Sequence, residues 1–164
     1  IMSSAKQRVY DELLDYLSSN EVVKINGQFV SLWDFQIKFS PEQEKIKNQI
    51  LSIFVDNKYN PPKPKELPTM LNVQEKEINQ ILDALITDGE LIKVDQENIF
   101  SKDAISDAKN LLVDYIKNNG SIQLGQFRDM LGTSRKFAMA ILDYFDRNKI
   151  TKRIDDIRVL FKDV

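Results

Sequence analysis

The chain has 164 residues, 42% of them hydrophobic and 29% charged, and its formal net charge is −2. It contains neither cysteine nor histidine, which excludes disulfides, thiolate or imidazole metal sites and the triads of serine and cysteine hydrolases. No apolar run approaches the roughly eighteen residues that span a bilayer. We therefore expect a cytoplasmic protein without membrane contact, with no catalytic residue, no metal and no cofactor in this chain.

The first unit, residues 1–38, predicts one helix and one hairpin. The helix ends near Ser19, and the β-like runs V-V-K-I and Q-F-V-S-L flank Asn26 and Gly27, a pair typical of a tight hairpin turn. A last helix followed by a hairpin is the C-terminal part of a small domain. We expect this unit to be truncated.

The second unit, residues 39–101, predicts a complete domain. Ser40 and Pro41 are a helix cap and a proline at the first helical position, and apolar residues recur at the helical period as far as Val55. The run Y-N-P-P-K-P then ends this helix. A later helix has a predicted buried stripe of Ile78, Ile81, Leu82 and Leu85. Its outer face is mostly acidic, so we expect this unit to repel phosphate and to act as a spacer or arm.

The third unit, residues 102–164, contains the most informative stretch, F-R-D-M-L-G-T-S-R-K. It predicts a short helix, a turn at Gly132 and a longer helix capped by Thr133 or Ser134. Two β-like runs, I-T-K-R-I and I-R-V-L-F, follow the longer helix. A short helix, a tight turn, a longer helix and a hairpin together predict a winged helix.

Helix-ending residues repeat along the chain and indicate its organisation. Asn20, Gly89 and Asn148 occupy equivalent positions, where glycine and asparagine tolerate the left-handed conformation. The number of residues between successive helix-ending positions is the length of one small domain each time. The predicted fold is mainly α with small β wings (α+β), as tandem winged-helix domains.

Basic residues are concentrated in the third unit. From residue 121 to the end there are nine Lys or Arg against six Asp or Glu, a balance of +3, which leaves −5 for the first 120 residues. Arg135 and Lys136 lie on the first turn of the longer helix, where free backbone N–H groups already attract anions. Lys152 and Arg153 on the first wing strand, and Arg158 on the second, are further candidates. Because side chains alternate along a strand, only one of Lys152 and Arg153 shares a face with Arg158.

The strings F-R-D-M-L-G-T-S-R-K-F-A, L-D-Y-F-D-R and I-T-K-R-I-D-D-I-R-V-L resemble the last domain of the bacterial selenocysteine-specific elongation factor (SelB) family. The resemblance covers residues 121–160 and implies a winged helix that binds the selenocysteine insertion hairpin of messenger RNA. The matching positions that it implies for RNA binding are Arg128, Ser134, Arg135, Lys136, Arg153 and Arg158. Lys152, on the wing, and Met139, on the outer side of the longer helix, complete the predicted set; Arg128 has Asp129 or Asp143 as alternative partners.

The resemblance also implies a role for the chain. It would be a C-terminal fragment, monomeric, that holds an elongation factor on the hairpin so that a UGA codon is recoded, and it would reach the ribosome through the full-length factor. The chain has no G-x-x-x-x-G-K-[ST] loop. The GTPase domain that the resemblance implies would therefore lie elsewhere in the full-length protein, and we expect this chain to bind no GTP.

Two other functions remain open from the sequence. Winged helices commonly bind DNA as transcription regulators, and they also serve as protein-interaction modules, because fold alone does not fix function. Asp143, in the middle of the longer helix, would oppose deep insertion into a DNA groove. Binding to a hairpin RNA, to its DNA analogue and to a DNA duplex would separate these functions.

Overall fold

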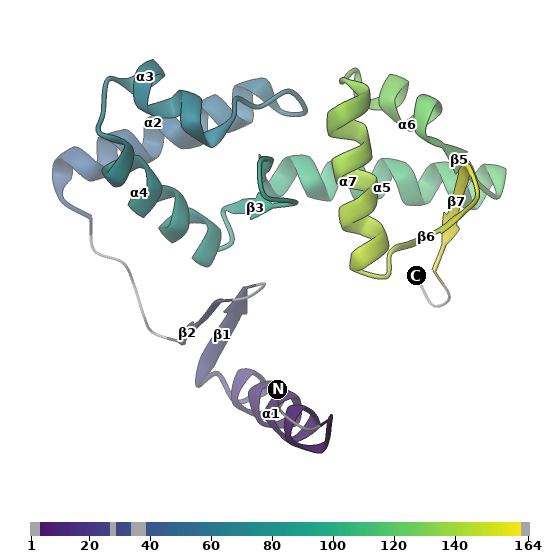
Figure 1. Ribbon diagram of the computed structural model, residues 1–164, viewed down its shortest axis with the longest axis horizontal. Helices are drawn as coiled ribbons and strands as arrows, with labels where there is room; N and C mark the ends of the chain where they lie inside the picture. The colour runs from purple at the N-terminus through teal and green to yellow at the C-terminus, as the bar shows by residue number, and fades with distance from the viewer. Residues whose placement is uncertain (1–3, 27–28, 34–38, 162–164) are drawn as a thin grey trace.

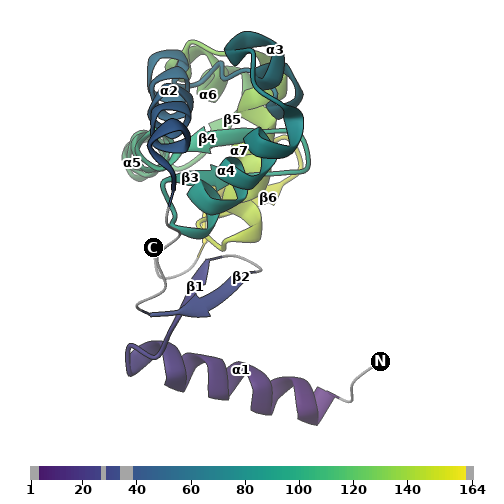
Figure 2. The same cartoon turned by 90° about the vertical axis from the view of Figure 1, so that its left-hand side faces the viewer.

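The computed structural model describes residues 4–26, 29–33 and 39–161 (Figure 1). Its elements form three successive groups, each with one or more helices followed by an antiparallel hairpin. The first group consists of α1 (Ser4–Ser19), β1 (Val23–Asn26) and β2 (Phe29–Leu32), and it lies apart from the other helices in both views (Figures 1 and 2). Asn26 pairs with Phe29 across the hairpin. The predicted turn residue Gly27 lies outside the described residues.

The second group is built around the capped helix that the sequence predicts. It consists of α2 (Pro41–Asn57), the 3-10 helix η1 (Pro64–Glu66), α3 (Leu67–Leu71), α4 (Glu75–Thr87), β3 (Leu91–Lys93) and β4 (Ile99–Ser101). The Ser40 hydroxyl accepts a hydrogen bond from the Gln43 N–H at 3.2 Å, and the Gln43 side chain accepts one from the Ser40 N–H at 3.0 Å. This reciprocal cap begins α2 at Pro41.

The third group has the same order of elements with one additional strand. It consists of α5 (Lys102–Asn119), β5 (Ile122–Gln123), α6 (Leu124–Leu131), α7 (Arg135–Arg147), β6 (Thr151–Ile154) and β7 (Ile157–Leu160). The sheet has the strand order β5-β7-β6 and is antiparallel throughout. The predicted fold class is confirmed: the chain is mainly helical with small antiparallel sheets. Among the described helices, none combines the length and apolar character needed to cross a bilayer.

Two local predictions need correction. The left-handed residues after α1 and α7 are Glu21 (φ 57°) and Lys149 (φ 55°), one position beyond the predicted Asn20 and Asn148. The asparagines instead complete the helix ends, because each side-chain amide donates to the carbonyl four residues earlier, at 2.8 Å. Gly89 is left-handed as predicted (φ 75°).

The apolar stripes that the sequence predicts are otherwise buried as expected. Ile50 and Phe54 of α2 are fully buried, and so is the predicted stripe of α4. On α7 the buried residues are Ala138, Ile141, Leu142 and Phe145. Val55 is the exception, since 59% of its surface is exposed. It lies one residue beyond Phe54, and the helical turn carries it out of the face that packs on α4.

The second and third groups share an apolar core. Tyr59, Val94 and Phe100 belong to the second group by sequence, yet they are buried in the cluster formed by α5, α6 and α7. The Phe100 ring meets that of Phe137 edge-on, with 5.8 Å between centroids. Ser101 ends β4 and also caps α5, accepting from the Ala104 N–H at 3.2 Å. The predicted domain boundary after residue 101 thus falls at a junction without a linker, and the domain limits stay a prediction.

The shared core makes the two groups depend on each other for stability. We expect Phe100→Ala to lower the free energy of unfolding by about 3–5 kcal/mol, because the ring is fully buried and its removal leaves a cavity. Val55→Ala, at an exposed helical position, is the control and should change it by less than about 0.5 kcal/mol. Urea unfolding followed by circular dichroism measures both, and equal losses in the two variants would contradict the shared core.

Candidate nucleic-acid interface

The turn between α6 and α7 places the first turn of α7 at the surface. Gly132 ends α6 in the left-handed conformation (φ 60°), as the sequence predicts. Ser134 is the cap of α7, and its hydroxyl accepts from the Phe137 N–H at 3.2 Å. Thr133, the alternative predicted cap, instead donates to the Tyr59 carbonyl at 2.6 Å, so it joins the third group to the second.

Two exposed cations occupy the first turn of α7. Arg135 and Lys136 lie at the positive end of the helix dipole, where cations are disfavoured and anions are stabilised. The equivalent turn of α4 carries Glu75 and Glu77, which suit the dipole. The first turn of α7 thus carries two cations at a position where the helix dipole favours anions. An arriving phosphate would meet both the cations and the free N–H groups of this turn.

Lys136 contacts a residue that the sequence analysis did not identify. Its ammonium binds Glu97 Oε2 at 2.9 Å, and Lys63 approaches the same oxygen at 3.4 Å. Glu97 lies on the connection between β3 and β4, in the second group. No local pattern indicates these partners, because Glu97 and Lys136 are 39 residues apart and meet only after the two groups have docked.

This contact shifts the pKa of both partners. The hydrogen bond from Lys136, followed by that from Lys63, lowers the pKa of Glu97 below its ordinary value. The hydrogen bond to Glu97 raises the pKa of Lys136. Both groups therefore stay charged through the neutral range.

The wing presents two more cations on different faces. Lys152 and Arg153 are both exposed on β6, and Arg153 lies directly opposite Arg158 of β7. Arg153 is therefore the residue that shares a face with Arg158, in agreement with strand alternation. Its Nε donates to the Asp155 carbonyl at 2.9 Å, which holds the side chain close to the wing turn.

Arg158 itself lies inside the domain, which corrects its predicted place on the RNA-contacting surface. Only 2% of its side chain is exposed, and it binds Asp143 Oδ1 at 2.9 Å and Asp146 Oδ2 at 3.1 Å. Met139 is half-buried beside it, with its sulfur 3.6 Å from the guanidinium. The acids of α7 thus hold the wing against the helix. Met139 packs against the core and is not a freely exposed side chain.

Arg128 is partly exposed and already paired. Its guanidinium binds Asp129 at 2.6 Å, one of the two alternative partners that the sequence suggests. The cations that remain most accessible among the predicted set are Arg135, Lys136, Lys152 and Arg153, with Ser134 exposed at the cap. Arg135 and Lys136 lie on α7, and Lys152 and Arg153 lie on β6. In the described part of the chain, no cluster of three side chains of the kinds that bind metals occurs.

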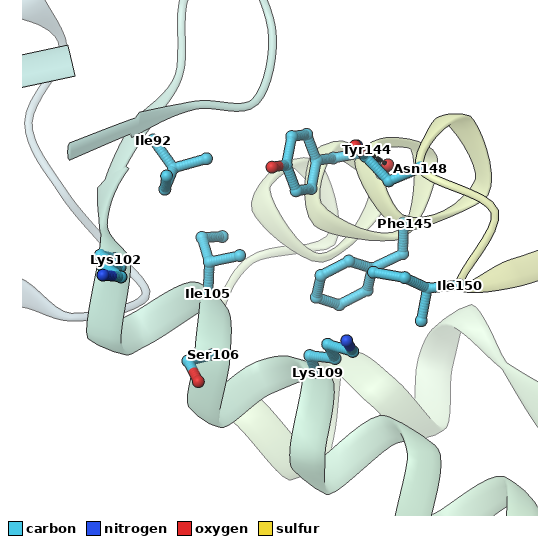
Figure 3. A pocket seen from close by; sticks show the side chains of 9 residues that line it. All are labelled: Ile92, Lys102, Ile105, Ser106, Lys109, Tyr144, Phe145, Asn148 and Ile150. Carbon is cyan, nitrogen blue, oxygen red and sulfur yellow. Dashed lines mark hydrogen bonds between the residues drawn. The ribbon is translucent and has the colours of Figure 1, made fainter. Parts of the chain in front are cut away.

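The opposite end of α7 is covered by the second group. Arg147 donates to the Val94 carbonyl, beside a cavity of about 250 Å³. Figure 3 shows Ile92, Ile105 and Tyr144 around this cavity, on β3, α5 and α7. Its lining is mainly apolar, and burial raises the pKa of the Tyr144 phenol. The segment between Val94 and Phe100 therefore contacts α7 near both of its ends.

The short helix, turn, longer helix and hairpin of residues 124–160 define a winged-helix domain, a class that binds nucleic acids or proteins. The family model described as "Elongation factor SelB, winged helix" matches residues 114–160. The resemblance found in the sequence is thus confirmed over these residues.

Two curated relatives match most of the chain. The selenocysteine-specific elongation factor of Desulfomicrobium baculatum is 28% identical over 142 residues, which are 87% of this chain and 21% of the relative. That of Escherichia coli (strain K12) is 29% identical over 141 residues, which are 86% of this chain and 22% of the relative. The chain therefore spans about a fifth of the length of these relatives.

Two solved structures are also similar. The mRNA-binding domain of elongation factor SelB from E. coli, solved in complex with SECIS RNA, has a TM-score of 0.66 and 28% identity, and the match covers 76% of this chain and all of that one. A bacterial selenocysteine-specific elongation factor, EF-Sec, has a TM-score of 0.58 and 20% identity, covering 92% of this chain and 24% of that one. The second likeness concerns the fold alone.

The buried position of Arg158 predicts a structural role for this residue. Arg158→Leu should lower the free energy of unfolding by about 3 kcal/mol, because it leaves Asp143 and Asp146 without their shared cation. Arg153→Leu, its exposed cross-strand neighbour, should cost less than about 0.5 kcal/mol. Denaturant unfolding of both variants tests this, and an Arg158 variant as stable as the unmodified chain would contradict it.

The contact between Glu97 and Lys136 predicts a measurable titration. Because the carboxylate is favoured in the folded state, its pKa should lie below the ordinary value, and the stability that it contributes should be lost as the pH falls through that pKa. Carbon-detected NMR of the Glu97 carboxyl measures the midpoint. Lys136→Gln should raise this midpoint toward the ordinary value; the same midpoint in both proteins would show that the pair does not form in solution.

Proposed function

We propose that this chain is the part of a selenocysteine-specific translation elongation factor that binds a hairpin in messenger RNA. Bound to the selenocysteine insertion hairpin, it tethers the factor so that a UGA codon is recoded. The observation that carries the proposal is the pair of exposed cations, Arg135 and Lys136, at a capped helix start within the family-matched residues 114–160. The likeness to an E. coli mRNA-binding domain in complex with SECIS RNA supports the same function.

The rest of the proposal follows from this role. The chain acts as a monomer in the cytoplasm, contacts the ribosome through the full-length factor and performs no catalysis itself. The GTPase activity of such a factor belongs to a part of the full-length protein that this chain does not match.

RNA is recognised mostly at loops and bulges, since the deep groove of its helix hides the base edges. A surface with exposed cations on α7 and the wing suits the end of a hairpin, where phosphates and unstacked bases lie close together.

The structure argues against the alternative of a DNA-binding regulator. Such proteins insert the recognition helix into the major groove. Here Phe137 packs on Phe100, Arg147 binds the Val94 carbonyl, and Asp143 is held by Arg158. The first turn of α7 and the wing are exposed, which suits surface contact with RNA better than groove insertion.

The proposed class of ligand is tested by comparing three nucleic acids. A hairpin RNA is first selected from a pool with a randomised loop by retention on the chain, and its DNA analogue and a DNA duplex of equal length are then compared by fluorescence anisotropy. We expect the selected RNA hairpin to bind at least tenfold more tightly than either DNA. Equal or tighter binding of the duplex would favour the DNA-binding alternative.

Arg135 should contribute directly to this affinity. If it contacts one phosphate, Arg135→Ala should weaken binding of the selected hairpin and lower the magnitude of the log-affinity against log-salt slope by about 0.7 to 0.9. The matched control is Lys76→Ala, because Lys76 occupies the first turn of α4 between two glutamates. We expect the control to bind like the unmodified chain. A folded Arg135 variant with unchanged affinity and slope would refute this contact.

A further inference from the structure

Two lysines from different groups of the fold meet at one carboxylate oxygen. Glu97 Oε2 lies 2.9 Å from the Lys136 ammonium and 3.4 Å from that of Lys63. The side chains are 61% exposed for Glu97, 52% for Lys136 and 36% for Lys63. The carboxylate thus marks a solvent-accessible position at which an anion touches both cations, beside the first turn of α7.

The backbone around this position is fixed, although the three side chains face solvent. The Asp95 carboxylate accepts from the backbone N–H groups of Glu97 and Asn98, both at 2.8 Å, which defines the turn that carries Glu97. The Lys63 N–H donates to the Glu66 carboxylate at 2.8 Å, and Lys136 belongs to α7. The backbone positions from which the two lysine side chains extend are therefore set by local hydrogen bonds and by α7.

This contact is not what docks the two groups. Exposed ion pairs contribute little to stability, whereas the Phe100 and Phe137 rings and the Thr133 hydrogen bond to Tyr59 join the groups at buried or partly buried positions. Glu97 balances one of the two ammonium charges and the nearby Asp95 the other, so a net positive charge is available only when Glu97 is displaced. The exposure of the cluster, and the single oxygen that both ammonium groups contact, fit an anion site better than a structural bridge.

We propose that Lys63 and Lys136 together bind one backbone phosphate of the RNA, and that Glu97 is the anion that this phosphate displaces. The inference rests on the proposed RNA-binding function and extends it to the second group. That group then acts as more than a spacer, because Lys63 contributes a contact and Glu97 sets how much of the lysine charge is available. Asp95, which also acts on Lys136 electrostatically, remains in its turn and is not displaced.

Removing the competing carboxylate should strengthen RNA binding. Glu97→Gln should raise the affinity for the selected hairpin RNA about two- to fivefold. The lysines then neutralise the phosphate without competition from Glu97, so the magnitude of the salt slope should rise by at most about 0.7 to 0.9, the release expected for one phosphate. Glu75→Gln makes the same change in net charge at an exposed position of α4 and should have a smaller effect on both quantities. Unfolding temperatures should change only slightly in both variants, because exposed ion pairs contribute little to stability.

Lys63 provides the second half of the test. Lys63→Gln should weaken hairpin binding about two- to fivefold, and more strongly in the Glu97→Gln background, whereas Lys65→Gln, two residues away and exposed, should have little effect. Weaker binding by Glu97→Gln would show that Glu97 positions Lys136, and would overturn the proposal. Equal effects of Lys63→Gln and Lys65→Gln would overturn it too. In either case tight binding of the hairpin by the unmodified chain, and its loss in Arg135→Ala, would leave the RNA-binding function standing.

Discussion

The docking of the segment from Val94 to Phe100 onto α7 is the constraint on which the rest of the structure depends. The junction at Ser101 has no linker, so β4 passes directly into α5 and the second hairpin is carried to the side of the third group. Burial of Phe100 in the core of that group then fixes the arrangement, because an aromatic ring of this size contributes several kcal/mol when it leaves water. Two units that are separate in sequence thereby become one body.

This constraint determines which surface is left for a ligand. One face of α7 packs on its own core, another lies against the preceding hairpin, and its acids are occupied by the buried Arg158. The first turn of α7 and the outer side of the wing are exposed and carry cations. The cations at that turn oppose the helix dipole, and the nearby Glu97 offsets part of their charge. Both observations fit a surface that is arranged for an incoming polyanion.

Local sequence predicted the local structure well and the contacts between units poorly. The Ser134 cap, the left-handed Gly132 and the buried stripe of α7 follow from rules that act within one turn of chain. The sequence pattern places Arg158 on the surface and gives no sign of its partners. Asp146 and Asp143 lie 12 and 15 residues earlier, and only the packing of the sheet brings them to Arg158. Lys63 and Glu97 carried no signal at all, since their proximity to Lys136 is a product of docking. Pattern and spacing identify the helix that bears the site, but not the residues that other elements bring to it.

The most direct test of RNA binding at the start of α7 is the map of backbone amide shifts when the isotope-labelled chain is titrated with the selected RNA hairpin. We predict that the largest changes occur at Arg135 and Lys136 and on the wing at Lys152 and Arg153, with further changes at Lys63 and Glu97. The equivalent turn of α4, around Lys76, should change little. Changes centred on α4, or on the cavity beside Tyr144 at the other end of α7, would contradict the proposed surface.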